Sequence, residues 1–379
     1  MAVWGGTGGL STSGPRLTPP VDKLPLPLHW PLYFLQASGA HSGLSVCYSS
    51  DNRSSVTKGR TVKKECSRRD VLAAVPSALG IGLAAGSASW SRAEGADRPA
   101  DLPFGFCLNT STLMGHKLPI EKELTIAAEA GYQAVEPWIR ELDQYVASGG
   151  NLKDLGKKIR DLGLTVESAI GFFDWVVDDD NQRRKAFEEA KRNMDLVHQI
   201  GGHRLAAPPG GATDRSDLDL RKIAERYRAL LELGDTMEVV PQVEVWGFSK
   251  TLGRLSEAAY VVIEAAHPKA CILPDVYHLY RGGSGFEGLK LLGKDAIHVF
   301  HLNDYPADPP QNVITDAHRV YPGDGTAPLT ELFRTLRAIG FHGVLSLELF
   351  NREYWKQDPV VVARTGIEKM RNAVRKSFA

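Results

Sequence analysis

The sequence predicts an α/β protein whose main domain, residues 101–379, is a (β/α)8 TIM barrel. From Pro103 onward, eight short apolar or β-branched runs alternate with longer amphipathic stretches, which is the pattern of repeated βα units around a parallel sheet. The segment after the first run, Cys107–Ser111, lacks the glycine-rich fingerprint of a doubly wound sheet. A chain of 379 residues has room for a leader and one barrel, which commonly takes about 250 residues.

The predicted strands are short runs rich in Val, Ile, Leu and Ala. They are Phe104–Leu108, Ala134–Trp138, Thr165–Ile170, Arg204–Ala207, Gln242–Trp246, Ala270–Pro274, Ile297–Asn303 and Val344–Phe350. The helices expected between them have apolar residues at helical spacing, and Gly340 is a stop signal for the last. They include Glu121–Ala130, Gln182–Ile200, Leu218–Gly234, Ser256–Ala266 and Leu329–Ile339.

Residues 1–100 differ in composition from the barrel and are predicted to form a disordered leader. Pro, Ser and Gly are frequent up to Ser55, and no apolar periodicity is sustained. Arg68 and Arg69 precede a weakly apolar run, Ala73–Ala88, so residues 62–96 resemble a twin-arginine export signal. This predicts an exported, periplasmic protein. The alternative is a cytoplasmic protein in which the arginine pair caps a surface helix.

The apolar run of the leader contains Pro76 and several glycines. This composition suits an export signal better than a membrane span, which needs ~20 strongly apolar residues. We therefore expect no stable membrane span. A long stretch precedes the arginine pair, and a translation start near Val62 would shorten it to the usual basic region of a signal.

The charge balance narrows the classes of binding partner, and the cysteine spacing indicates the state of the thiols. Lys and Arg together number 45, as do Asp and Glu, so the formal net charge is zero. Such a chain has no bulk basic field to attract nucleic acid or an anionic membrane surface, which favours a small ligand and leaves a homo-oligomer open. Cys47, Cys66, Cys107 and Cys271 form no close pair, and we expect free thiols.

Four predicted strands end in side chains that can bind a metal, and the C-terminal ends of barrel strands carry catalytic groups. Glu244 and Glu348 stand among apolar neighbours, where an ionised carboxylate is costly unless it is paired. A salt bridge is one solution, but strands five to eight supply almost no inward basic residue. Asp275 and His301 are the nearest partners. Three carboxylates and one imidazole suit one divalent metal, Mn²⁺ or else Mg²⁺ or Co²⁺, with open positions for substrate oxygens.

Between Phe104 and Phe350 the chain resembles the xylose-isomerase-like barrels, which include sugar and sugar-phosphate isomerases, ketose 3-epimerases and inosose dehydratase. That family holds its metal with residues on strands five to eight: a Glu, an Asp followed three positions later by a His, a His, and a Glu. The matching residues are Glu244, Asp275 with His278, His301 and Glu348, while Arg319 matches an Arg before a Pro-Gly and Glu136 an acid at the end of strand two.

The resemblance implies a sugar or polyol isomerase or epimerase that moves a proton through an enediolate. The residues it implies are Glu244, Asp275, His301 and Glu348 for the metal, Glu244 and Glu348 for proton transfer, and His278, Arg319 and Glu136 for substrate binding. Arg319 could equally form a loop salt bridge with Asp316 or Asp324. An inosose-type dehydratase stays open, because loss of water would begin with the same proton abstraction. Loops 109–116 and 171–180 hold no phosphate-binding glycine motif, which favours an unphosphorylated substrate.

The barrel also resembles endonuclease IV, a DNA-repair enzyme with three zinc ions. Asp275, His278, Asp316 and His318 match its Asp-x-x-His and Asp-x-His pairs. Strands three and four, however, lack the two histidines that complete its first zinc site. Since the net charge is zero, we expect no nucleic-acid partner.

A further alternative is a non-catalytic barrel that binds a sugar through the same metal. Trp138, Trp175 and Trp246 could pack against a pyranose face, although single aromatic residues at strand ends more often belong to the core. Turnover separates this alternative from an enzyme.

Overall fold

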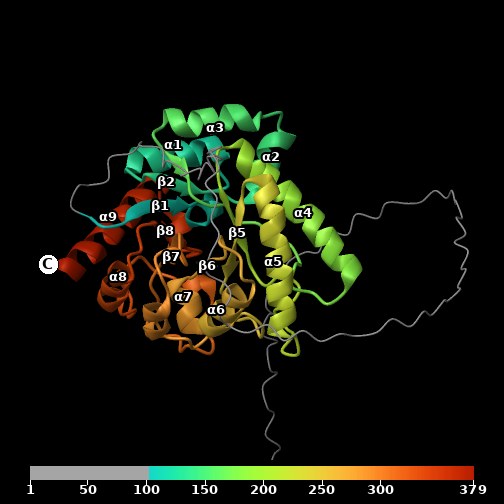
Figure 1. Ribbon diagram of the computed structural model, residues 1–379. Coiled ribbons are helices and arrows are strands. Elements are labelled where there is room, and N and C mark those ends of the chain that lie inside the picture. The colour runs from blue at the N-terminus through green and yellow to red at the C-terminus, as the bar shows by residue number, and fades with distance from the viewer. Residues whose placement is uncertain (1–101) are drawn as a thin grey trace, which may run out of the picture. The chain divides into compact units, whose positions relative to one another are not determined.

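The computed structural model describes residues 102–379 (Figure 1). The predictions on the disordered leader, on the export signal at residues 62–96 and on Cys47 and Cys66 fall outside these residues. In the described part, parallel strands alternate with helices that surround them, which confirms the predicted (β/α)8 barrel.

Eight strands occur at the predicted places. They are β1 Gly105–Asn109, β2 Ala134–Glu136, β3 Thr165–Val166, β4 Arg204–Ala207, β5 Val240–Glu244, β6 Ile272–Leu273, β7 Val299–Leu302 and β8 Val344–Leu347. Hydrogen bonds join them in two parallel sections of the barrel wall, β3-β2-β1-β8-β7 and β4-β5-β6. The first and last strands, β1 and β8, are direct neighbours, as a closed barrel requires.

Irregular backbone pairing joins the two sections on both sides. Beyond β3, the carbonyl of Ala169 accepts a hydrogen bond from the N–H of Ala206 at 2.9 Å, and the Ala169 N–H donates to Arg204 at 3.2 Å. Beyond β6, Asp275 pairs with His301 of β7 in a parallel bridge. The wall is therefore closed, and the second junction places two predicted metal ligands side by side.

Several strand ends differ from the prediction. β5 runs from Val240 to Glu244, two residues earlier than predicted, so Glu244 is the last residue of the strand. β6 ends at Leu273 because Pro274, which lacks an N–H, cannot continue the ladder. These shifts change the strand lengths but leave Glu244 and Asp275 at the C-terminal end of the barrel.

The helices cover the outside of the barrel (Figure 1). They are α1 Ile120–Ala130, α2 Ile139–Ala147, α3 Leu152–Asp161, α4 Asp180–Gln199, α5 Leu220–Met237, α6 Leu255–Glu264, α7 Val276–Arg281, α8 Leu329–Ala338 and α9 Pro359–Phe378. The carboxyl-terminal α9 packs against α1 and α8 and so links the two ends of the barrel sequence. Within residues 102–379, none of the helices combines the length and the apolar character that a membrane crossing requires.

Side chains of the strands alternate between two cores. Phe106 and Leu108 of β1 belong to the large core between the strands and the helices, whereas Cys107 belongs to a smaller cluster on the inner face. That inner cluster combines small residues such as Ala134 and Ala206 with larger ones such as Trp138 and Leu273. The barrel is thus filled by packed side chains rather than being a pore, and its polar groups gather at the C-terminal end.

The two described cysteines are free thiols, as predicted. Cys107 and Cys271 are both 0% exposed and form no disulfide within residues 102–379. Burial raises the pKa of Cys271 to about 12 and the pKa of Cys107 well above its ordinary value. Both are therefore packing residues without thiolate reactivity at neutral pH.

Candidate active site

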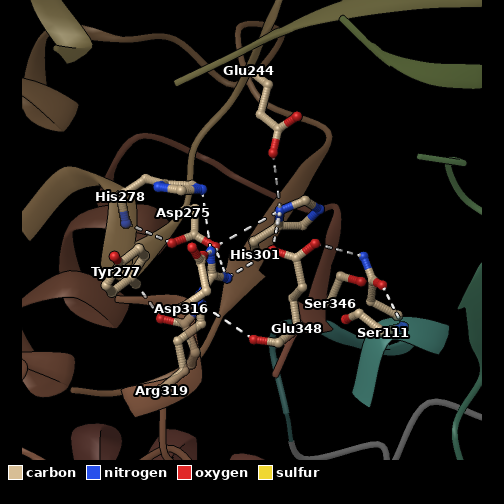
Figure 2. Close-up of polar contacts among 12 residues, drawn as sticks. Ser111, Glu244, Asp275, Tyr277, His278, His301, Asp316, Arg319, Ser346 and Glu348 are labelled. Atoms are coloured by element: carbon tan, nitrogen blue, oxygen red, sulfur yellow. Dashed lines mark hydrogen bonds and ion pairs between the residues drawn. The ribbon is translucent and has the colours of Figure 1, made fainter. Parts of the chain in front are cut away.

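His301, on β7, lies at the centre of the candidate site and is 0% exposed (Figure 2). Its Nδ1 atom is 3.2 Å from Glu348 Oε2, 3.8 Å from Asp275 Oδ2 and 3.9 Å from Glu244 Oε1. Its Nε2 atom faces away from these three carboxylates and is 3.0 Å from Glu136 Oε2. The structure therefore brings together the four residues that the sequence predicts as metal ligands.

The barrel geometry explains this convergence. Glu244 is the last residue of β5, Asp275 follows β6, His301 lies near the end of β7 and Glu348 follows β8. Adjacent strands of a barrel end at the same rim, so residues at those ends face a common point. Asp275 also begins α7, because its Oδ1 accepts a hydrogen bond from the His278 N–H at 2.7 Å.

Two of the unsatisfied atoms of this cluster fit a cation. Among the described residues, His301 Nδ1 and Glu244 Oε2 are buried and find no hydrogen-bond partner. Buried polar atoms without partners are costly, so their presence at one point indicates a ligand that satisfies them. Asp275, His301 and Glu348 each offer one ligand atom, and these atoms lie within 4.8 Å of one another. Oxygen-rich donors with one imidazole suit a hard divalent ion.

Electrostatics leads to the same interpretation. Burial raises the pKa of Glu244 to about 8, and Glu348 adds to this shift. Burial disfavours a charged His301, but Glu348 and Glu136 outweigh it and raise the pKa of His301 well above its ordinary value. Burial likewise opposes ionisation of Glu348, yet the positive charges of His301 and Arg319 hold its pKa well below the ordinary range. Protons on Glu244 and His301 thus balance the excess of carboxylates, and a divalent cation could replace them.

Glu136 lies behind His301 and is 0% exposed. Its Oε2 accepts hydrogen bonds from Ser346 Oγ at 2.7 Å and Asn109 Nδ2 at 3.0 Å, in addition to its contact with His301 Nε2. This network implies that Nε2 keeps its proton, so Nδ1 is the nitrogen that faces the carboxylates and would lose its proton to bind a metal, the arrangement of many carboxylate–histidine–metal sites. The structure thus places Glu136, which the sequence predicts to bind substrate, behind His301, where its carboxylate can orient the imidazole.

Arg319 reaches the cluster from the loop between β7 and α8 and is 1% exposed. Its Nη1 donates to Asp275 Oδ2 at 2.8 Å and to Glu348 Oε2 at 2.7 Å, while its Nη2 donates to Asp316 Oδ1 at 2.6 Å. The predicted salt bridge with Asp316 therefore exists beside the contacts in the site. Asp324 instead pairs with Lys369. The inward basic residue that strands five to eight lack is supplied by this loop.

His278 lies beside Arg319 at the edge of the cluster (Figure 2). Its Nε2 is 3.1 Å from Arg319 Nη2, and its Nδ1 is 3.3 Å from the N–H of Gly247. Burial lowers the pKa of His278, so the neutral ring is the stable form at neutral pH. A neutral imidazole beside a fixed guanidinium can hold a substrate oxygen without adding charge.

Two asparagines of the site escaped the sequence analysis. Asn109, at the end of β1, donates to Glu136 and also to Glu348 Oε1 at 3.2 Å. Asn303, directly after β7, donates to Asp275 Oδ2 at 3.0 Å. Both are polar residues that end an apolar strand, and this signal could have revealed them.

The second metal pair of the nuclease pattern is not assembled. His318 Nδ1 is 2.9 Å from Thr315 Oγ1 at the start of a short 3₁₀ turn, Asp316–His318. The guanidinium of Arg319 lies between Asp316 and His278, where a second cation would have to bind. Among residues 102–379, the one group of side chains placed to hold a metal is the cluster around His301.

Five aromatic residues form a continuous arc that ends beside His278, and we call them the aromatic arc. In order of contact they are Phe350, Trp138, Phe172, Trp246 and Phe248, with neighbouring ring centroids 5.2–5.9 Å apart, and Phe248 lies 5.7 Å from the His278 ring. Phe172 and Phe248 are 46% and 45% exposed. Trp175, in contrast, is fully buried and donates to the Pro208 carbonyl at 2.7 Å, so its predicted sugar contact is corrected to a core position.

The fold and the cluster define a (β/α)8 barrel with side chains that could bind a metal at the C-terminal ends of four consecutive strands. Residues 124–373 match the model of the xylose isomerase-like TIM barrel family, and the chain belongs to that family. It is similar to an inosose isomerase of Bacillus licheniformis, with 29% identity over 283 residues that cover 72% of this chain and 98% of the relative.

Two further similarities agree with this assignment. A fructoselysine 3-epimerase of Escherichia coli O157:H7 is 23% identical over 270 residues, which cover 68% of this chain and 94% of the relative. A crystal structure of the IOLI protein with a bound zinc atom superimposes with a TM-score of 0.67 at 22% identity, over 73% of this chain and 100% of that one. At this identity the structural likeness supports the fold alone.

Proposed function

We propose that this protein is a divalent-metal-dependent isomerase or epimerase that moves a proton at the carbon next to the carbonyl of an unphosphorylated cyclic sugar or polyol ketone. The convergence of Glu244, Asp275 and Glu348 on the free Nδ1 of His301 supports this proposal most strongly. The names of the relatives, inosose isomerase and fructoselysine 3-epimerase, agree with proton transfer next to a carbonyl.

Glu244, Asp275, His301 and Glu348 would hold one metal ion. When bound, a divalent cation supplies an electrophile that polarises a carbonyl oxygen and acidifies the neighbouring C–H bond. Three carboxylates and one imidazole favour Mn²⁺, with Mg²⁺ and Co²⁺ as alternatives. Since the IOLI structure contains zinc, metal analysis of the purified protein should include Zn²⁺.

Glu244 and Glu348 would move the proton. They reach His301 from β5 and β8 and lie on different sides of its ring in Figure 2. One carboxylate would accept the proton from the substrate carbon, and the C–H electron pair would pass into the carbonyl to give an enediolate. The other glutamate, protonated to the carboxylic acid, would return a proton to the opposite face of that carbon or to its neighbour. Arg319 and His278 would bind the substrate oxygens, and the guanidinium stays charged at every working pH.

The aromatic arc supports a cyclic substrate. A six-membered ring with equatorial hydroxyls directs its C–H bonds to its two faces, so those faces are apolar and can stack on aromatic rings. An open-chain polyol offers no such face. Phe172 and Phe248 are exposed, and both contact Trp246. A phosphorylated substrate is disfavoured because three carboxylates already neutralise the charge of Arg319, which leaves the guanidinium a donor for a neutral oxygen but no net positive charge for a phosphate.

Isotope exchange tests this proposal. We expect the protein with added Mn²⁺ in D₂O to place deuterium next to the carbonyl of an inosose more efficiently than in open-chain ketoses. Phe172→Ala and Phe248→Ala should each lower kcat/KM for the inosose about two- to tenfold, as expected for the loss of one aromatic contact. Tyr260→Ala on α6, which removes an exposed aromatic ring outside the arc, should have no effect.

Other outcomes of this experiment would select other functions. Loss of water from the inosose after exchange would identify a dehydratase on the same site. Binding of a metal and a polyol without any exchange would identify a sugar-binding barrel. Preference for open-chain ketoses, unaffected by Phe172→Ala, would contradict the cyclic substrate. Nicking of DNA at abasic sites with added zinc would identify a nuclease.

We also propose that the protein is exported through the twin-arginine pathway. Replacing Arg68 and Arg69 together by Lys should leave the protein in the cytoplasm, because this pathway recognises the arginine pair. Cell fractionation and immunoblotting measure the distribution, and wild-type protein in the same strain is the control. Periplasmic protein in the Lys-Lys variant would contradict the pathway. Export of a folded barrel would let the metal be chosen before the site meets copper or zinc, which bind such ligands more tightly.

A further inference from the structure

Arg319 lies in a long loop, residues 303–328, and one buried carboxylate holds this loop in place. We infer that Asp304 is a positioning residue for the reaction, because it fixes the loop conformation that delivers Arg319 to Asp275 and Glu348. The inference rests on the proposed substrate-binding role of Arg319. It concerns a residue that does not itself contact the cluster around His301.

The side chain of Asp304 accepts four hydrogen bonds from backbone N–H groups and is 1% exposed. Oδ1 accepts from Tyr305 at 2.8 Å and from Ala327 at 2.9 Å. Oδ2 accepts from Gly323 at 2.9 Å and from Gly325 at 3.1 Å. One side chain thereby joins the start of the loop to the segment that leads into α8.

The backbone of Asp304 holds the loop at a second place. Its N–H donates to the carbonyl of Val320 at 2.9 Å, and its carbonyl accepts from the N–H of Val320 at 2.9 Å. Val320 directly follows Arg319. Val320, which follows Arg319 in the chain, and the turn at residues 323–327 are therefore both attached to Asp304.

Arg319 requires this support because of where it lies. Its guanidinium is buried and makes contacts of 2.6–2.8 Å with three carboxylates, and a shift of about 1 Å would break such contacts and misplace the substrate oxygens. The other predicted site residues lie on strands, at strand ends or, for His278, in helix α7, whereas Arg319 lies in irregular backbone, where positions are less fixed. A second contact, from Asn351 Nδ2 to the Arg319 carbonyl at 2.9 Å, supports the loop from the far side.

The loop is also shaped to fit the carboxylate. A Cβ atom at Gly325 would lie 2.3 Å from Asp304 Oδ1 and 2.3 Å from the carbonyl of Tyr305. Gly325 is therefore needed for the close approach between the turn and Asp304. Asparagine at position 304 would retain the size of the side chain but would turn an NH₂ group toward backbone N–H donors, so two of the four hydrogen bonds would be lost.

The experiment uses the full chain and four variants: Asp304→Asn, Gly325→Ala, Arg319→Lys and the double variant Asp304→Asn/Arg319→Lys. Asp304→Asn and Gly325→Ala should each raise KM for the exchanged ketone and lower kcat/KM about tenfold or more, while metal stoichiometry stays at the wild-type value. In the Arg319→Lys background, Asp304→Asn should cause almost no further loss. Asp324→Asn is the matched control, because it removes a carboxylate from the same loop that pairs with Lys369 on the surface.

Two measurements do not depend on turnover. Backbone amides of residues 323–327 should exchange at least ~tenfold faster in Asp304→Asn than in Asp324→Asn. The ¹⁵Nε resonance of Arg319, assigned by its loss in Arg319→Lys, should broaden or shift in Asp304→Asn. A wild-type protein that exchanges no ketone would overturn the proposed function, and these two measurements would still decide the inference about the loop. Unchanged amide exchange, or losses in Asp304→Asn and Arg319→Lys that multiply in the double variant, would overturn the positioning role.

Discussion

Replacing His301 by Ala, or Asp275 by Asn, should abolish stoichiometric binding of Mn²⁺ while the far-ultraviolet circular dichroism spectrum stays that of the folded barrel. His301 offers the one nitrogen ligand of the cluster, and its Nδ1 is the atom on which the carboxylates converge. Asn at position 275 retains an oxygen that can cap α7, so the helix is kept while the charge is lost. Equilibrium dialysis followed by elemental analysis measures the occupancy.

Glu123→Gln is the matched control for this loss. Glu123 is another buried carboxylate, 2% exposed, on α1 and outside the cluster. Burial raises its pKa to about 9, so it is neutral at pH 7 and the substitution removes no charge. Full metal occupancy in both ligand variants would show that the cluster is not the metal site. Loss of metal in Glu123→Gln as well would indicate a general loss of structure.

Substitution of Glu136, which lies behind the predicted ligand His301, should weaken metal binding less than substitution of a ligand. Glu136→Gln keeps an oxygen that can accept from His301 Nε2 or Ser346 but removes the negative charge that fixes the imidazole tautomer. Substitutions of such supporting residues typically weaken metal binding about 10–100-fold. The same dialysis experiment at higher metal concentration should therefore restore full occupancy in Glu136→Gln but not in His301→Ala.

The sequence allowed the prediction of the barrel and the metal cluster because both depend on local patterns. Strand-like runs that alternate with amphipathic stretches specify the fold class, and a charged residue at the end of an apolar strand, such as Glu244 or Glu348, needs a partner that only the barrel rim can provide. The resemblance to a known family supplied the alignment of the ligands with the strands. Four residues on four neighbouring strands meet in any closed barrel, whatever the details of its loops.

What the sequence did not predict depends on side-chain direction and on loop conformation. Glu136 ends β2 as expected, but its orientation behind His301 follows from the hydrogen bonds of Asn109 and Ser346. The burial of Arg319 beside the cluster follows from the conformation of its loop, which Asp304 fixes through hydrogen bonds to residues about twenty positions later in the sequence. Such contacts leave no periodic signal. Strand ends were also shifted, because irregular pairing beyond β3 and β6 replaces regular ladders there.

Glu244→Gln and Glu348→Gln should each lower the rate of deuterium exchange into the substrate about 10²–10⁴-fold, the usual contribution of a general acid or base. Glutamine keeps a neutral oxygen that can approach the metal but cannot accept the proton from carbon. Partial metal binding should therefore persist, and measurements at saturating metal separate the loss of the base from the loss of the ion. Proton NMR or mass spectrometry of the recovered ketone measures the exchange.

The two substitutions should also affect different kinetic parameters, because the two carboxylates lie in different surroundings. Glu348 is paired with Arg319 and hydrogen-bonded by Asn109, whereas Glu244 has one oxygen that finds no partner among the described residues. Glu348→Gln should therefore also disturb Arg319 and raise KM, while Glu244→Gln should act mainly on kcat. Glu123→Gln again serves as the control and should exchange like the wild type. Wild-type exchange rates in both Glu244→Gln and Glu348→Gln would show that the proton moves through other residues, and His278, which borders the same cluster, would be the next to substitute.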